Sequence, residues 1–124
     1  MEIYHPSKAP LAEDWLNLDE DIRIDLVKNS HELAGIEFEN GAIDIHSLIH
    51  VIVENQLAMK VVPVPETIAK LTRQGLSRHE AIHAIGAVIS EDLFEMMKNN
   101  QEHDIKKYRK RLDKLTAKRW RKGK

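Results

Sequence analysis

The sequence predicts an all-α protein: a small helical bundle of four main helices with a basic helical extension at the C-terminus. Aromatic residues make up only 5% of the 124 residues, so side chains that favour strands are scarce. The apolar residues recur mainly at intervals of three and four instead of alternating, which is the spacing of a helix face. The absence of cysteine excludes disulfide scaffolds, thiol nucleophiles and iron–sulfur clusters.

The first main helix is predicted over residues 19–34, with Asp19 as its cap and Gly35 as its stop. The preceding segment, with Trp15, is expected to pack against its start. The core stripe of this helix is expected to contain Ile22, Leu26, Val27 and Leu33.

A loop with the sequence GIEFENG leads into the second predicted helix, residues 42–60. Its expected outer face carries Asp44, Ser47, Asn55 and Ala58, and its expected apolar face carries Ile43, Ile45, Leu48, Ile49, Ile52, Val53 and Leu57. Pro63 and Pro65 then interrupt the helical pattern, because proline cannot continue a helix and keeps the preceding residue extended.

A short third helix is predicted from Pro65 to about Gly75, and the fourth covers residues 78–99. Ser77 and Glu80 have the spacing of a capping box at the start of the fourth helix. Its expected core stripe is Ile82, Ile85, Ile89, Leu93 and Met96.

The C-terminal tail is expected to be helical as well, because Ile105, Tyr108, Leu112 and Leu115 follow helical spacing. We therefore predict one helical domain over residues 1–105 and a basic helical tail over residues 106–124.

Charge is divided unevenly along the chain. Residues 106–124 carry eleven lysines and arginines and a single acid, a net charge of +10, whereas residues 1–105 carry −11. One function that this charge allows is binding to nucleic acid or another anionic partner, with Tyr108 and Trp120 available to stack on bases. The alternative is that the tail docks on the chain's own acidic residues between 13 and 44.

No apolar stretch opens the chain, and no window is long and apolar enough for a membrane span. We therefore expect no signal peptide, no membrane span and a cytoplasmic location.

Four histidines form two pairs, His46/His50 and His79/His83, each with a spacing of four residues. This spacing places both rings of a pair on one helix face. Glu54 continues the first series by one more turn. Imidazole and carboxylate groups are ligands of divalent transition metals, so we predict a metal site between the second and fourth helices, with zinc as the first expectation. Its predicted ligands are His46, His50, His79 and His83, with Glu54 as a fifth ligand or behind the others.

The pattern assigns no catalytic residue. In a catalytic version of the site, a metal-bound water would be the nucleophile, and Glu54 or Glu80 would be the base. The alternative is a structural one: the imidazoles form a polar network in the core by hydrogen bonding to one another, to Glu54 and to Gln56. In this alternative the protein would be a homo-oligomer, a structural homodimer whose histidines are polar groups of the core. His31 is expected to lie at the surface or at an edge.

Residues 79–83 also match the H-E-x-x-H signature of zinc peptidases. Glu80 is already explained by the capping box, and the motif opens its helix instead of lying inside it. No sheet that could form a substrate cleft is predicted. A peptidase is therefore not expected.

The segment with His46, His50, Glu54 and Gln56, a proline break and then the RHEAIHAIG stretch resembles a family of small bacterial helical proteins of unknown function. The resemblance covers about residues 40–95 and includes Glu91. It implies a bacterial cytoplasmic protein with a helical fold around the paired histidines. It implies no activity, so the ligand assignment rests on residue spacing.

Overall fold

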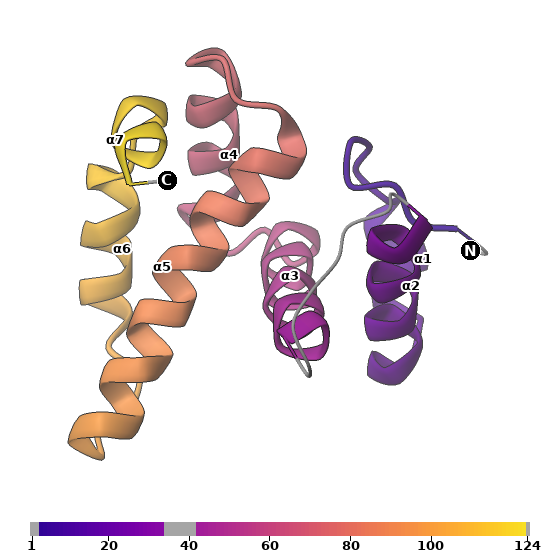
Figure 1. Ribbon diagram of the computed structural model, residues 1–124, viewed down its shortest axis with the longest axis horizontal. Coiled ribbons are helices and arrows are strands. Elements are labelled where there is room, and N and C mark those ends of the chain that lie inside the picture. The colour runs from indigo at the N-terminus through magenta and orange to yellow at the C-terminus, as the bar shows by residue number, and fades with distance from the viewer. Residues whose placement is uncertain (1–2, 34–41, 124) are drawn as a thin grey trace. The chain divides into compact units, whose positions relative to one another are not determined.

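The computed structural model describes residues 3–33 and 42–123 (Figure 1). Within these ranges the regular structure consists of seven α-helices without a strand, which confirms the all-α class. The detail of a four-helix bundle is not confirmed. The chain divides into two compact units, unit 1 (Met1–Val61) and unit 2 (Val62–Lys124), and each is described by itself. The loop predicted at residues 35–41 lies outside the described residues.

Unit 1 contains α1 (Ala12–Leu16), α2 (Glu20–Leu33) and α3 (Ala42–Ala58), and α3 packs against both other helices. Its core cluster is formed by Tyr4, Trp15, Leu26, Val27 and Val51. The predicted packing of Trp15 before α2 is confirmed, because this side chain is fully buried.

A single amide ties the three helices of unit 1 together. The Trp15 indole Nε1–H and the Arg23 guanidinium each donate to Asn55 Oδ1 at 2.9 Å. Trp15 lies on α1, Arg23 on α2 and Asn55 on α3. This shared acceptor fixes how α3 lies against the first two helices.

The buried stripe of α3 differs from the one that its apolar residues predict. Ser47, His50, Val51 and Glu54 are buried, and their spacing is that of one helix face. Ile45 is 64% exposed, so its predicted core position is wrong, as is the predicted exposure of Ser47. Buried polar side chains are tolerated when hydrogen bonds offset their loss of water, which is how a polar stripe can occupy a core position.

Similar exceptions occur on the other long helices. On α2 the predicted core stripe is right at Leu26 and Val27, but Ile22 is 45% exposed. On the helix predicted over residues 78–99 it is right at the three isoleucines, while Leu93 is 38% exposed.

Unit 2 contains α4 (Val64–Arg73), α5 (Arg78–Asn99), α6 (Ile105–Lys114) and α7 (Ala117–Lys122). α5 packs against α4 and α6, and α4 also contacts α6. The bounds of α5 are those predicted, and the Ser77 hydroxyl caps it by accepting from the Glu80 backbone N–H at 3.1 Å.

The C-terminal tail is helical as predicted, but it forms two helices. Leu115 is extended, and the Thr116 hydroxyl then caps α7 by accepting from the Arg119 backbone N–H at 3.1 Å. The side chain of Gln74 accepts from the Ala117 backbone N–H at 2.8 Å, which links α7 to the end of α4. The predicted domain boundary after residue 105 stays a prediction.

Acidic residues of α5 hold the tail. Arg111 pairs with Asp92 and with Glu95, the latter at 2.6 Å, and Lys107 pairs with Glu95 at 2.5 Å. The hydrogen bonds from Lys107 and Arg111 lower the pKa of the Glu95 carboxyl below its ordinary value. We expected the docking acids between residues 13 and 44, but the ion pairs that the structure shows for the tail are on α5.

Among the described helices, none combines the length and the apolar character needed to cross a membrane.

Candidate metal centre

The five predicted metal ligands belong to two units. His46, His50 and Glu54 lie on α3 in unit 1, and His79 and His83 lie on α5 in unit 2. Each set is described by itself. In both sets the spacing of four residues places the rings on one side of a helix, as predicted.

In unit 1, the Tyr4 hydroxyl joins two of the predicted residues. It donates to Glu54 Oε2, and it lies 2.7 Å from His50 Nε2. A hydroxyl that gives its proton to a carboxylate can only accept from the ring. In the neutral ring the proton therefore sits on Nε2, and Nδ1 is the nitrogen with the lone pair. All three side chains are almost completely buried.

His31 is the second unpredicted member of this cluster. It is 1% exposed, so its predicted position at the surface or an edge is wrong. Its Nδ1 lies 2.8 Å from the Val27 carbonyl oxygen, which can only accept, so Nδ1 carries the proton. Nε2 is then the lone-pair nitrogen, and His46 Nε2 lies 3.1 Å from it.

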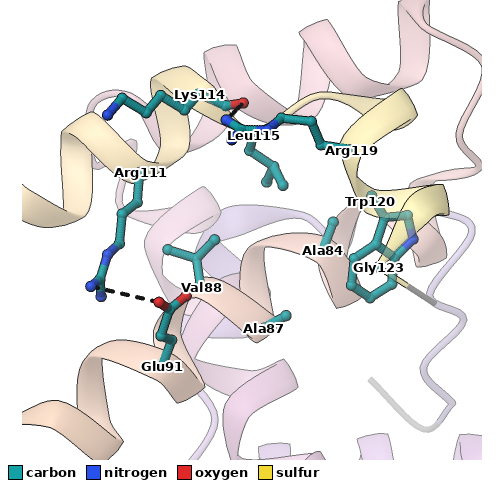
Figure 2. A pocket seen from close by; sticks show the side chains of 10 residues that line it. All are labelled: Ala84, Ala87, Val88, Glu91, Arg111, Lys114, Leu115, Arg119, Trp120 and Gly123. Carbon is teal, nitrogen blue, oxygen red and sulfur yellow. Dashed lines mark hydrogen bonds and ion pairs between the residues drawn. The ribbon is translucent and has the colours of Figure 1, made fainter.

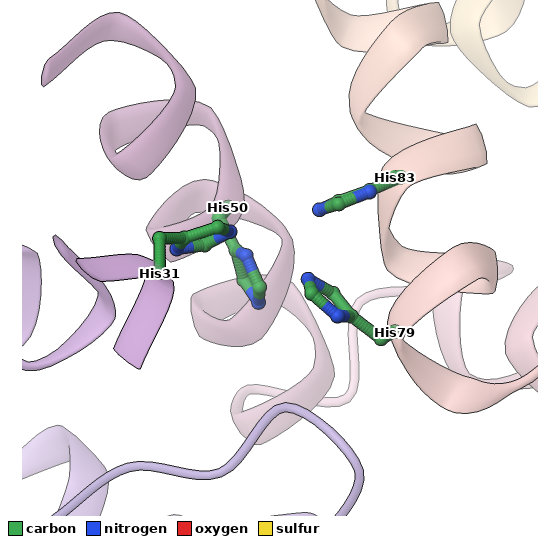
Figure 3. A group of neighbouring side chains, drawn as sticks. All are labelled: His31, His50, His79 and His83. Carbon is green, nitrogen blue, oxygen red and sulfur yellow. The ribbon is translucent and has the colours of Figure 1, made fainter. Parts of the chain in front are cut away.

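The rings of unit 1 pack edge to face. The centroids of His31 and His50 are 5.4 Å apart with planes at 83°, and those of His31 and His46 are 4.7 Å apart. Figure 3 shows His31 on α2 and His50 on α3 with their rings close together. Both neutral rings thus present a lone-pair nitrogen inside a buried polar cluster, where Val27 and Tyr4 determine which ring nitrogen carries the proton.

In unit 2, His79 and His83 project from successive turns of α5 (Figure 3). Their ring centroids are 4.2 Å apart, and both side chains are half-buried. Glu80 lies beside them in the first turn of α5, where its backbone N–H serves the Ser77 cap. The H-E-x-x-H segment therefore opens its helix, as the sequence indicates.

Within the described parts of the chain, the histidines with ring nitrogens suited to hold an ion are His31 and His50 in unit 1 and His79 and His83 in unit 2. His46 and Glu54 do not belong to this group. His46 contacts the candidate ligand His31 directly. Glu54 accepts from Tyr4, which contacts the candidate ligand His50. His50, His79 and His83 therefore remain candidate ligands, and His31 joins them. His46 stays a candidate through its contact with His31 Nε2.

Tyr4 and His31 escaped sequence reasoning because their partners are distant along the chain. Tyr4 is 46 residues from His50, and His31 is 15 residues from His46. A helical spacing pattern relates only residues within a few turns, so neither residue carried a local signal.

Comparison with known proteins identifies no relative. No family model, no curated protein and no solved structure matches the chain. The argument for function therefore rests on the geometry of the side chains.

Proposed function

We propose that the chain binds a divalent transition metal, with zinc as the first expectation, through the buried histidines of unit 1. His31 Nε2 and His50 Nδ1 are the proposed ligands. The observation that carries the proposal is the contact of His31 Nδ1 with the Val27 carbonyl at 2.8 Å. A ligand histidine in metalloproteins usually donates its other N–H to a carbonyl or carboxylate, which fixes the ring and the tautomer.

The environment of His50 supports the same role. Its Nε2–H points to the Tyr4 oxygen, and Tyr4 in turn is bonded to the Glu54 carboxylate. A carboxylate relayed to a histidine in this way makes the imidazole a stronger electron donor to a cation. Glu54 therefore takes the position behind the ligands and not that of a fifth ligand.

His46 is the proposed third nitrogen. Two nitrogen ligands at about 2.0 Å from a tetrahedral ion lie roughly 3.3 Å apart. The separation of the His46 and His31 Nε2 atoms, 3.1 Å, is close to that value. Three imidazoles would leave one coordination position for water, as in hydrolytic zinc sites.

The alternative is a metal-free network in which His46 Nε2–H donates to His31. The two readings differ in their response to metal. A metal that binds only the folded state raises the free energy of unfolding as its concentration rises, and a structural network shows no such response. Because imidazoles must be neutral to bind, metal affinity should also fall in acid.

The test is elemental analysis of untagged full-length chain purified without added metal or chelator, together with zinc titrations of the metal-free protein. We expect one equivalent of metal, lost in His31→Ala and His50→Ala. His31→Gln and His50→Gln repeat the test with side chains that keep some hydrogen bonding, in case the alanine variants do not fold. His5→Ala is the matched control, because His5 is exposed and lies outside the cluster.

The proposal would be overturned by a protein that is folded and metal-free and whose free energy of unfolding does not change when zinc is added. Full metal content in both unit 1 variants would also overturn it. The double variant His79→Ala with His83→Ala shows separately whether the pair on α5 takes up metal.

A further inference from the structure

A cavity of about 350 Å³ lies within unit 2, lined by residues of α5, α6 and α7 and their connections (Figure 2). Its volume falls at the lower end of the range for small-molecule sites. The cavity is independent of the proposed metal centre, because every residue that lines it belongs to unit 2.

One side of the cavity is apolar and aromatic. Ala84, Ala87 and Val88 form a stripe along α5, and in Figure 2 Leu115 points toward this stripe from the end of α6. The Trp120 ring stands beside them. Small aliphatic side chains next to an indole suit a flat apolar body of modest size.

The charged lining residues are three cations, Arg111, Lys114 and Arg119, and one acid, Glu91. Arg111 is already held by Asp92 and Glu95, and its guanidinium also lies 3.6 Å from Glu91. In Figure 2 the Lys114 side chain runs along α6 away from the apolar stripe. The cation left for a ligand is therefore Arg119.

Arg119 is suited to a carboxylate. Its Nη1 donates to the Lys114 carbonyl at 3.0 Å, which positions the guanidinium, and it forms no ion pair with a carboxylate in the described part of the chain. A guanidinium has five N–H donors and binds a carboxylate through two of them at once. Unit 2 has fifteen lysines and arginines against eight acids, a net charge of +7, which also favours an anion.

We propose that this cavity binds a small organic carboxylate with a flat apolar body. The carboxylate pairs with Arg119, and the body lies between the Trp120 ring, Leu115 and the apolar stripe of α5.

The test is a titration of the ¹⁵N-labelled full chain with 2-naphthoate, followed through the indole N–H signals of its two tryptophans. Trp120→Phe assigns the signals. We expect the Trp120 signal to shift and saturate, and the Trp15 signal to stay. The neutral amide 2-naphthamide tests the charge and acetate tests the apolar body, and each should bind at least about tenfold more weakly.

Variants locate the site. Arg119→Gln should weaken 2-naphthoate binding about tenfold, since it removes the charge-assisted pair. Its fold should be kept, because the Thr116 cap uses the Arg119 backbone and the side-chain bond to the Lys114 carbonyl is exposed to solvent. Ala87→Leu should block binding by filling the cavity from an exposed position on α5. Lys118→Gln, on the same helix as Arg119 but outside the cavity, is the matched control.

Three results would overturn the proposal. The first is a Trp120 signal that does not move at millimolar 2-naphthoate. The second is equal affinity for 2-naphthamide, which would remove the role of the carboxylate. The third is a loss of affinity in Lys118→Gln as large as that in Arg119→Gln, which would mean that general positive charge attracts the anion.

Discussion

The Tyr4 hydroxyl contacts two buried polar side chains of α3, His50 and Glu54. One contact orients His50, and the other offsets part of the free-energy cost of burying Glu54. Without the hydroxyl, two buried groups lose a hydrogen-bond partner at once.

Tyr4→Phe should therefore lower the free energy of unfolding by about 1–3 kcal/mol, the cost of leaving a buried polar group unsatisfied. If His50 binds metal, zinc affinity should also fall by about 10–100-fold, because the group that orients the ligand is gone. Urea denaturation of the metal-free protein and a zinc titration measure the two effects separately. Glu54→Gln keeps an acceptor for the hydroxyl but removes the charge. If it lowers the zinc affinity as much as Tyr4→Phe does, the effect belongs to the charge of the carboxylate. Unchanged stability in Tyr4→Phe would contradict the role given to the hydroxyl.

The sequence predicted three of the five polar residues that cluster in unit 1. The spacing of His46, His50 and Glu54 identified one stripe of α3, because helix geometry relates neighbours on a face. The residues that complete the cluster, Tyr4 and His31, come from other segments and are brought in by tertiary packing. Their role depends on single atoms, such as the Val27 carbonyl, that no side-chain pattern encodes.

The attachment of α6 to α5 centres on Arg111. Its side chain is 20% exposed and pairs with Asp92, whose side chain is 8% exposed. Removing one partner of a buried ion pair leaves the other charge uncompensated. Because the guanidinium is partly exposed, Arg111→Gln should lower the free energy of unfolding by about 1–3 kcal/mol. Arg109→Gln, an exposed neighbour on the same helix, should change it by less than about 0.5 kcal/mol. Equal effects in denaturation experiments would show that the pairing with Asp92 does not hold the helix.

The same helix pair should loosen in acid. The folded state holds the pKa of Glu95 below its ordinary value of 4.5, chiefly through the hydrogen bond from Lys107. A lowered pKa contributes stability above the unfolded value, and that stability is lost as the pH falls below 4.5 and through the folded value. Thermal unfolding of Glu95→Gln should show a weaker dependence on pH in this range than the parent chain does. An identical acid profile for both proteins would count against this pairing.

Element boundaries were predicted better than element faces. Ser77, Gly75 and the two prolines are local signals that depend on backbone chemistry alone, and α5 begins where Ser77 indicates. The face of α3 depends on what the rest of the unit offers. Tyr4 provides a partner for His50 and Glu54, so the polar stripe turns inward and Ile45 turns outward. The spacing of apolar residues along one helix does not show that a distant residue will supply a hydrogen-bond partner.

The whole chain consists of two compact units, each with its own buried residues. If each unit is a separate cooperative structure, a destabilising substitution should act locally. Hydrogen exchange should then show faster exchange in α2 and α3 for Tyr4→Phe and in α5 and α6 for Arg111→Gln, each leaving the other unit unchanged. Faster exchange throughout the chain in either variant would show that the described helices unfold as one.

The boundary between Val61 and Val62 also separates the charges, since unit 1 has four lysines and arginines against twelve acids, a net of −8, and unit 2 has +7. A protease that cut the chain there would turn one nearly neutral polypeptide into two fragments of opposite sign. In an electrophoresis gel at neutral pH the two would migrate toward opposite electrodes. An ion-exchange resin of either sign would likewise retain one fragment and release the other.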